Sequence, residues 1–167
     1  MDKYRTSLLF QCLIFLIPLN IYMWGNWLLV NVQWAFFRFQ QSELGNCLVF
    51  GYQDISYIYF GQNTGLFNIA AACLWTMGSI ILFVGLLTTI YAYSDERSSM
   101  LKNASFFTIG GGIILGVSAL CRFQGGFAIP IGVPIILIIG WWIYEENSIE
   151  EEIDMESDDD LEEVPDS

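Results

Sequence analysis

The chain has 167 residues, of which 54% are hydrophobic and only 14% are charged, and its formal net charge is −12. The charged share lies well below the roughly 25% that is usual for soluble domains. Residues 145–167 hold 13 of the 18 acidic residues, so residues 1–144, with six basic and five acidic residues, carry a net charge of +1. No extended basic patch is present to neutralise a nucleic-acid backbone, and we therefore expect no nucleic-acid partner.

Four apolar segments have about the length that a helix needs to cross a bilayer core about 30 Å thick. They contain no Asp, Glu, Lys, Arg or His, and they cover residues 7–24, 67–91, 106–121 and 127–144. The sequence therefore predicts an all-α integral membrane protein with four transmembrane helices. Its polytopic membrane domain would cover residues 1–144, and the acidic tail, residues 145–167, would be disordered because it is too charged to bury a core.

The first apolar segment has a second interpretation as a signal peptide, since Lys3 and Arg5 precede it. We favour an uncleaved anchor, because the apolar stretch is long and no A-x-A-like cleavage site follows it. Trp24 and Trp27 at its end are typical of a helix that stops at the membrane–water interface.

Residues 25–66 form the predicted outer loop, and its first part alternates between apolar and polar side chains. Val30, Val32 and Trp34 are separated by Asn31 and Gln33, a period of two that is typical of a half-buried strand. Residues 48–60 are rich in Val, Ile, Tyr and Phe, as strands are. We expect a β-hairpin-like loop near the membrane surface. The alternative is a first helix that continues to residue 37, followed by a re-entrant or interfacial segment.

Basic residues near the ends of the predicted helices indicate the orientation of the chain in the cell membrane. A cytoplasmic N-terminus would place four basic residues inside and two outside, and the cytoplasmic side usually holds the excess. The four are Lys3, Arg5, Arg97 and Lys102, and the two are Arg38 and Arg122. We expect a multi-pass protein with both termini in the cytoplasm.

The predicted layout, with four spans and the largest outer loop between the first two, is similar to that of claudin-like tetraspan proteins. The similarity is one of layout only. The loop has a single cysteine, Cys47, and it has no Gly-Leu-Trp followed by a cysteine pair. No residue role therefore follows from this resemblance.

Small residues gather on the third apolar segment, where Gly112 and Gly116 form a GxxxG pattern. Such a pattern lets two helix backbones approach closely. Gly112 and Gly116 are therefore predicted helix–helix contact residues. The contact would be made with other helices of the same chain, with a second copy, or with a partner subunit.

The chain has four cysteines and no histidine. Cys47 and Cys121 would both lie on the outer side, where a disulfide between them could form. The alternative is that both remain free thiols packed against apolar groups. No C-x-x-C pair is present, so we expect no metal site and no cofactor.

The absence of ionisable residues from the apolar segments bears on function, because pumps and proton-coupled transporters usually keep such groups within the membrane. We also find no paired acid, base or nucleophile of the kind that catalysis requires, and we expect no enzyme. The leading hypothesis is a non-enzymatic membrane protein that acts in membrane assembly or protein–protein interaction, as a homo-oligomer or with a membrane protein partner. The alternative is a small accessory subunit of a channel or transporter.

Overall fold

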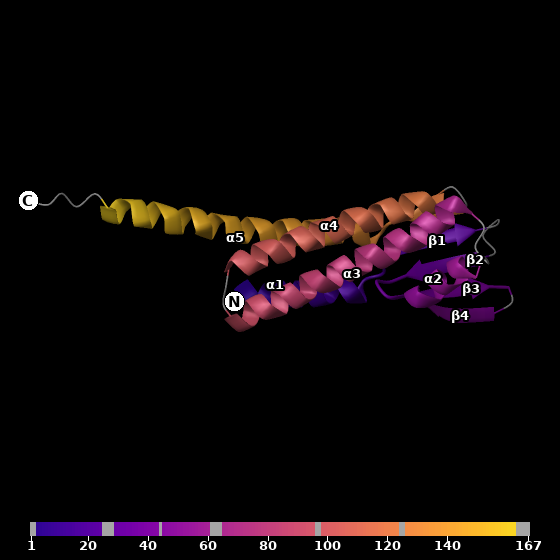
Figure 1. Ribbon diagram of the computed structural model, residues 1–167. Helices are drawn as coiled ribbons and strands as arrows, with labels where there is room; N and C mark the ends of the chain where they lie inside the picture. Colours follow the sequence, from indigo (N-terminus) through magenta and orange to yellow (C-terminus); the bar gives the residue numbers. More distant parts are fainter. Residues whose placement is uncertain are drawn as a thin grey trace, which may run out of the picture.

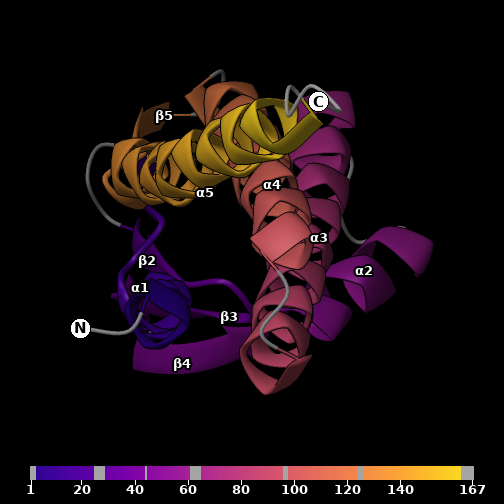
Figure 2. The ribbon, with the colours of Figure 1, turned by 90° about the vertical axis from the view of Figure 1, so that its left-hand side faces the viewer.

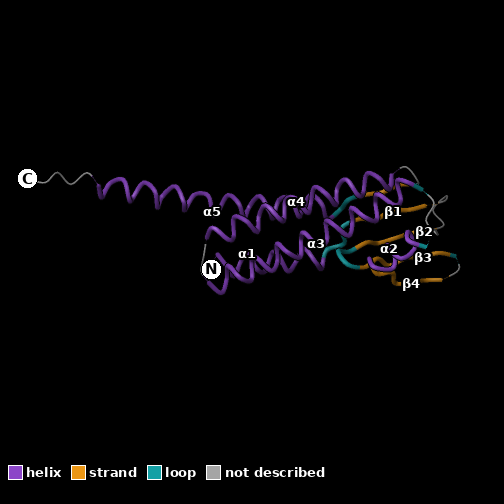
Figure 3. Tube along the Cα trace, viewed as in Figure 1, coloured by secondary structure: helices purple, strands orange, loops and turns teal. Residues whose placement is uncertain are grey.

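The structure is a computed structural model that describes residues 3–24, 29–43, 45–60, 65–95, 98–123 and 126–162. These residues form five helices and five strands (Figures 1 and 3). In chain order they are α1 (Lys3–Leu16), β1 (Asn20–Trp24), β2 (Leu29–Gln33), β3 (Phe37–Ser42), β4 (Gly45–Phe50), α2 (Gly51–Tyr59), α3 (Leu66–Asp95), α4 (Ser98–Arg122), β5 (Gly126–Ile129) and α5 (Gly132–Glu162).

The long antiparallel pair α3 and α4 organises the molecule. Helix α1 and the first part of α5 lie along one half of this pair, and the sheet lies along the other half (Figure 1). Viewed end-on, α4 lies between α3 and α5 (Figure 2), and α1 contacts both α3 and α5. The start of α1, the end of α3 and the start of α4 lie together at the end of the α3–α4 pair opposite the sheet, and α5 extends beyond them (Figure 1).

The five strands form one antiparallel sheet in the order β4-β3-β2-β1-β5. Strand β1 pairs with β2 on one side, where Tyr22 lies opposite Asn31, and with β5 on the other, where Tyr22 lies opposite Ala128. The sheet therefore joins the segment after α1 to the segment before α5, although about 100 residues separate them in the sequence.

The prediction of an all-α protein with four transmembrane helices is wrong. The described chain contains a five-stranded sheet, and only α3 and α4 among its helices are long and apolar enough to cross a membrane. Helix α1 has 14 residues, which corresponds to about 21 Å. The apolar start of α5, residues 132–144, is not longer than α1.

The sheet and the shortness of the first and last apolar helical stretches were missed for the same physical reason. The apolar segment 7–24 changes from helix to strand near Pro18, and the segment 127–144 changes from strand to helix near Pro130. Proline removes a backbone donor and disfavours the helical conformation in the residue before it. Apolar composition persists through the change, and hydropathy alone does not distinguish a buried helix from a buried strand.

The expected β-hairpin character of the outer loop is confirmed, because β2 pairs with β3 and β3 with β4 as antiparallel neighbours. These strands belong to the larger sheet, and residues 51–59, which were expected to be strand-like, form helix α2. The acidic tail expected to be disordered is helical as far as Glu162, in keeping with the good helix propensity of glutamate. Trp27 and Arg97, which entered the arguments on anchoring and orientation, lie outside the described residues.

Hydrogen bonds fasten the sheet to α3 and the two helix–strand junctions to each other. The indole Nε1 of Trp75 donates to the Trp34 carbonyl at 2.9 Å, and Ser79 Oγ donates to the Ala35 carbonyl. At the junctions, the Gly132 amide donates to the Leu19 carbonyl at 3.1 Å. The backbones are so close there that a Cβ added to Gly132 would lie 2.7 Å from the Pro18 carbonyl oxygen.

We expect Gly132→Ala to lower the free energy of unfolding by about 1–3 kcal/mol, because the added methyl must push two backbones apart. Gly110→Ala is the matched control. A Cβ at Gly110 meets nothing within 4 Å, and alanine is favoured over glycine within a helix by about 1 kcal/mol. Reversible unfolding of both variants in mild detergent measures the difference, and equal stability of the two would contradict the close junction.

Candidate functional site

The face of the sheet that lies against the helices is polar. Side chains alternate between the two faces of a strand, and the register brings Tyr22 of β1 beside Asn31 of β2, which pairs with Gln40 of β3. Arg38 of β3, two residues before Gln40, lies on the same face and pairs with Gln33. Five strand positions thus present hydrogen-bonding or charged groups to the interior.

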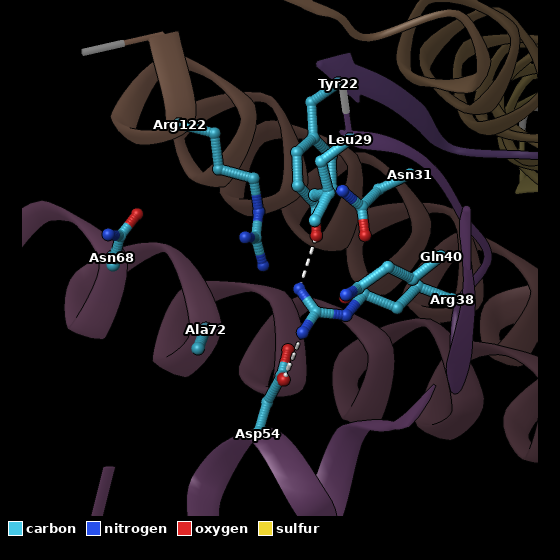
Figure 4. Close-up of a pocket in the computed structure, with 9 residues that line it drawn as sticks. All are labelled: Tyr22, Leu29, Asn31, Arg38, Gln40, Asp54, Asn68, Ala72 and Arg122. Carbon is cyan, nitrogen blue, oxygen red and sulfur yellow. Dashed lines mark hydrogen bonds and ion pairs between the residues drawn. The ribbon is translucent and has the colours of Figure 1, made fainter. Parts of the chain in front are cut away.

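An ion pair links this polar face to α2. Arg38 Nη2 lies 2.8 Å from Asp54 Oδ1, and both side chains are largely buried. Arg38 Nη1 donates to the Tyr22 hydroxyl, so a single guanidinium connects β1, β3 and α2 (Figure 4). The pair fixes the position of α2 over the sheet.

A second arginine enters the same region from the end of α4. The Arg122 guanidinium carbon lies 4.5 Å from the centre of the Tyr22 ring, within the range of a cation–π contact. The residue is only 4% exposed. Its Nε and Nη2 atoms are buried and have no hydrogen-bond partner among the described residues.

These side chains point toward one another around a cavity of about 170 Å³ (Figure 4). We call it the arginine pocket, and it is lined by Tyr22, Leu29, Asn31, Arg38, Gln40, Asp54, Asn68, Ala72 and Arg122. Both amide atoms of Asn31 and the second carboxylate oxygen of Asp54 also lack partners within the described structure. Two guanidiniums face one carboxylate, so the ionised pocket carries one positive charge in excess.

Burial affects the pKa values of both members of the Arg38–Asp54 ion pair. Burial raises the pKa of the Asp54 carboxyl, and it does so by more than Arg38 and Arg122 lower it. Ionised Asp54 therefore costs folding free energy, which is recovered as the pH falls through this raised pKa. Burial lowers the pKa of Arg38, but Tyr22 and Asp54 raise it by more, so Arg38 stays charged.

The opposite face of the sheet is apolar. One row crosses all five strands through paired positions, and a shorter row lies beside it. We call these residues the outer sheet face; the first row is Ile129, Ile21, Val32, Phe39 and Leu48, and the second is Phe127, Met23 and Val30. Leu48 is 48% exposed and Ile129 is 41% exposed. The sheet thus has its polar side inside and its apolar side outside, the reverse of a sheet in water.

The helix-contact residues predicted from the sequence lie against α5. A Cβ at Gly112 would meet Ile136 at 3.0 Å, and one at Gly116 would meet Val133 at 3.4 Å. The two glycines therefore adjoin another helix of the same chain. Any contact that they make with a second copy or a partner subunit stays a prediction.

The two cysteines proposed to pair are free thiols in the structure, and so are Cys12 and Cys73. Cys47 is exposed on the edge strand β4, and Cys121 is half-buried near the end of α4. A disulfide between them stays a prediction.

The arginine pocket was not found from the sequence. Arg38 and Arg122 were used only to orient the chain, and Asp54 was set aside for want of a recognisable motif. The signal that could have found them is the scarcity of charge in residues 1–144, because a charged residue between apolar segments is often buried with a partner. The pairing itself depends on the sheet register.

Comparison with known proteins adds no assignment to this site. The sequence matches no protein-family model, and a search of curated proteins finds no match.

The ion pair yields a test of this geometry. Arg38→Met should lower the free energy of unfolding by about 3–5 kcal/mol, because it leaves Asp54 buried without its partner. The double variant Arg38→Met/Asp54→Leu should recover most of that loss, since apolar groups often replace a buried pair without penalty. Unfolding in mild detergent measures both. Additive losses in the double variant would show that the two side chains do not interact.

Proposed function

We propose that the chain is a non-enzymatic integral membrane protein that acts in assembly, with the outer sheet face covered by another polypeptide. The observation that carries this proposal is the reversed polarity of the sheet. On this face Leu48, Ile129 and Phe39 are 48%, 41% and 37% exposed, and exposed apolar patches of this kind mark interaction sites or membrane contact.

Membrane embedding is supported by the two long helices and by the position of their charges. Helices α3 and α4 are apolar over a membrane-spanning length. On α4, Lys102 and Arg122 are 20 residues apart, or about 30 Å along the axis, which equals the thickness of a hydrocarbon core. Lys3 and Arg5 begin α1, at the end of the molecule where α4 starts. We propose that this end faces the cytoplasm, in line with the excess of basic residues there.

By the same measure, part of the sheet would lie within the hydrocarbon thickness. Tyr22 of β1 lies against Arg122, the last residue of α4. Asn20 and Gln33, at the other end of the paired strands, share a small cavity with Ser118 and Leu115 of α4. Strands β1 and β2 therefore run beside the last two turns of α4, between its two charges.

A sheet at this depth cannot simply face lipid. Strands β4 and β5 are its edges, and each pairs on one side only within the described sheet. Lipid offers no hydrogen bonds to backbone groups, so open sheet edges are not found in contact with the hydrocarbon. We infer a protein partner with an apolar, membrane-embedded surface, which is another membrane protein or a second copy of this chain.

A photoreactive amino acid in place of Phe39, on the outer sheet face, should crosslink to that partner in native membranes. Phe39→Asp should abolish the complex that copurifies in mild detergent, because a charge would have to be buried in the interface. Tyr59→Asp is the matched control, since Tyr59 is an exposed aromatic residue on α2 and should leave the complex intact.

Mass spectrometry of the crosslinked product distinguishes a second copy from a different protein. If the probe at Phe39 gives only lipid adducts, or if both Asp variants keep the same complex, the assembly function is contradicted.

A transport role as an accessory subunit of a channel or transporter is the second candidate, and one observation favours it. Buried amide atoms without a partner in the described structure occur both on α1 and in the sheet, namely Gln11 Oε1, Asn20 Oδ1, Gln33 Nε2 and both atoms of Asn31. Buried polar groups of this kind commonly hold water, and linked waters can carry protons.

If the chain contributes to proton flux, Gln11→Leu should reduce the rate at which protons cross the membrane of liposomes that contain the chain together with its copurified partner. Cys12→Ala, an exposed neighbour on the same helix, should not. A pH-sensitive dye inside the liposomes reports the flux. Equal flux with and without the chain would contradict this role.

A further inference from the structure

We infer that the arginine pocket binds a tetrahedral oxyanion of the phosphate class, supplied by a phospholipid headgroup or by free phosphate. The inference goes beyond the assembly function, although the headgroup source rests on the proposed membrane embedding. It stands on unpaired donors, on the balance of charge and on the place of the pocket in the fold.

The first argument is the set of donors left without acceptors. Nε and Nη2 lie on the same edge of the Arg122 guanidinium, and this edge forms two parallel hydrogen bonds to a carboxylate or phosphate. Arg38 Nε and Asn31 Nδ2 are also buried without partners in the described structure. Because an unpaired buried donor is costly, and a charged one more so, this arrangement calls for an acceptor in the pocket.

The second argument is charge. Asp54 offers one carboxylate, and its Oδ1 atom is already engaged by Arg38. Arg122 forms no salt bridge with a carboxylate among the described residues; it packs against the face of the Tyr22 ring and interacts with Asp54 only at longer range. An anion would neutralise the excess positive charge in a region of low dielectric, where such a charge is expensive.

The third argument is room and position. The cavity has a volume of about 170 Å³. A single water molecule needs a cavity of only about 10–15 Å³, so this one has room for a larger ligand. Arg122 ends α4 about one hydrocarbon thickness from Lys102. In the embedded chain the pocket would therefore lie at the depth of the headgroup phosphates.

The first arm of the test uses inorganic phosphate and the delipidated full chain in mild detergent. Equilibrium dialysis with radiolabelled phosphate, at constant ionic strength, should show one saturable site. Arg122→Gln should weaken binding by roughly tenfold or more, because the bidentate donor pair is lost. Arg5→Gln, which removes an exposed arginine at the other end of the molecule, should bind as the wild type does.

Two further variants separate loss of the site from loss of the fold. Arg122→Lys keeps the charge but not the side-on pair of donors, so it should bind more weakly than the wild type. Asp54→Asn removes the competing carboxylate and should bind phosphate more tightly. Equal binding by the wild type and all three pocket variants would overturn the inference.

The second arm uses lipid and compares the wild type with Arg122→Gln. The chain is reconstituted in bilayers of phosphatidylglycerol or of a phosphate-free galactolipid, and retained lipid is identified by native mass spectrometry. Selective retention of phosphatidylglycerol that is lost in Arg122→Gln assigns the headgroup source. Phosphate binding without lipid retention assigns the free anion.

Failure of both arms in the folded wild-type chain overturns the inference. That result would leave the crosslinking at Phe39 unaffected, because the outer sheet face and the arginine pocket lie on opposite faces of the sheet. Failure of the assembly function would likewise leave the phosphate titration unaffected, since that titration is made in detergent.

Discussion

Backbone hydrogen bonding is the constraint on which this fold depends. Two apolar segments stop being helical halfway along the α3–α4 pair, near Pro18 and Pro130. Their amides and carbonyls must then find partners outside a helix. They find each other, as β1 pairs with β5, and β2 to β4 continue the ladder. The sheet thus provides hydrogen-bond partners for the backbone groups of residues 20–24 and 126–129, which lie outside α1 and α5.

The polar inner face follows from where this sheet lies. Its ladder must be joined to helices that are apolar along most of their length, and individual polar contacts make the connection. Trp75 and Ser79 of α3 donate to carbonyls of the β2–β3 turn, and Asp54 of α2 holds Arg38 of β3. Arg122 adds a charge that these contacts do not balance. The fold therefore gathers the buried charges of Arg38, Asp54 and Arg122 at a single end, and the anion proposal rests on this asymmetry.

The sequence predicted some of these features and missed others, for identifiable reasons. Hydropathy correctly located the long helices, because α3 and α4 each contain an apolar stretch of membrane-spanning length. It could not separate α1 from β1, since Leu16 and Ile21 are equally apolar and only Pro18 marks the change. Period-two alternation around Val30 and Val32 did indicate a strand, but not the number of strands or their order.

The arginine pocket is a product of register and of long-range packing. Arg38 and Asp54 are 16 residues apart, and Arg122 is 68 residues further along the chain. No local pattern links such positions. Tyr22 contacts both arginines because β1 lies between β2 and β5. No short stretch of sequence predicts this strand order.

The pairing of Ile21 with Ile129 has a consequence for biosynthesis. Strand β1 leaves the ribosome early, whereas β5 emerges only after both long helices have been made. Until then β1 has one free edge, and a free strand edge is prone to pair with other chains. Closure of the sheet is consequently a late event with a long loop to close, and such contacts form slowly. A nascent chain of this protein therefore has to be shielded until its C-terminal third has been translated.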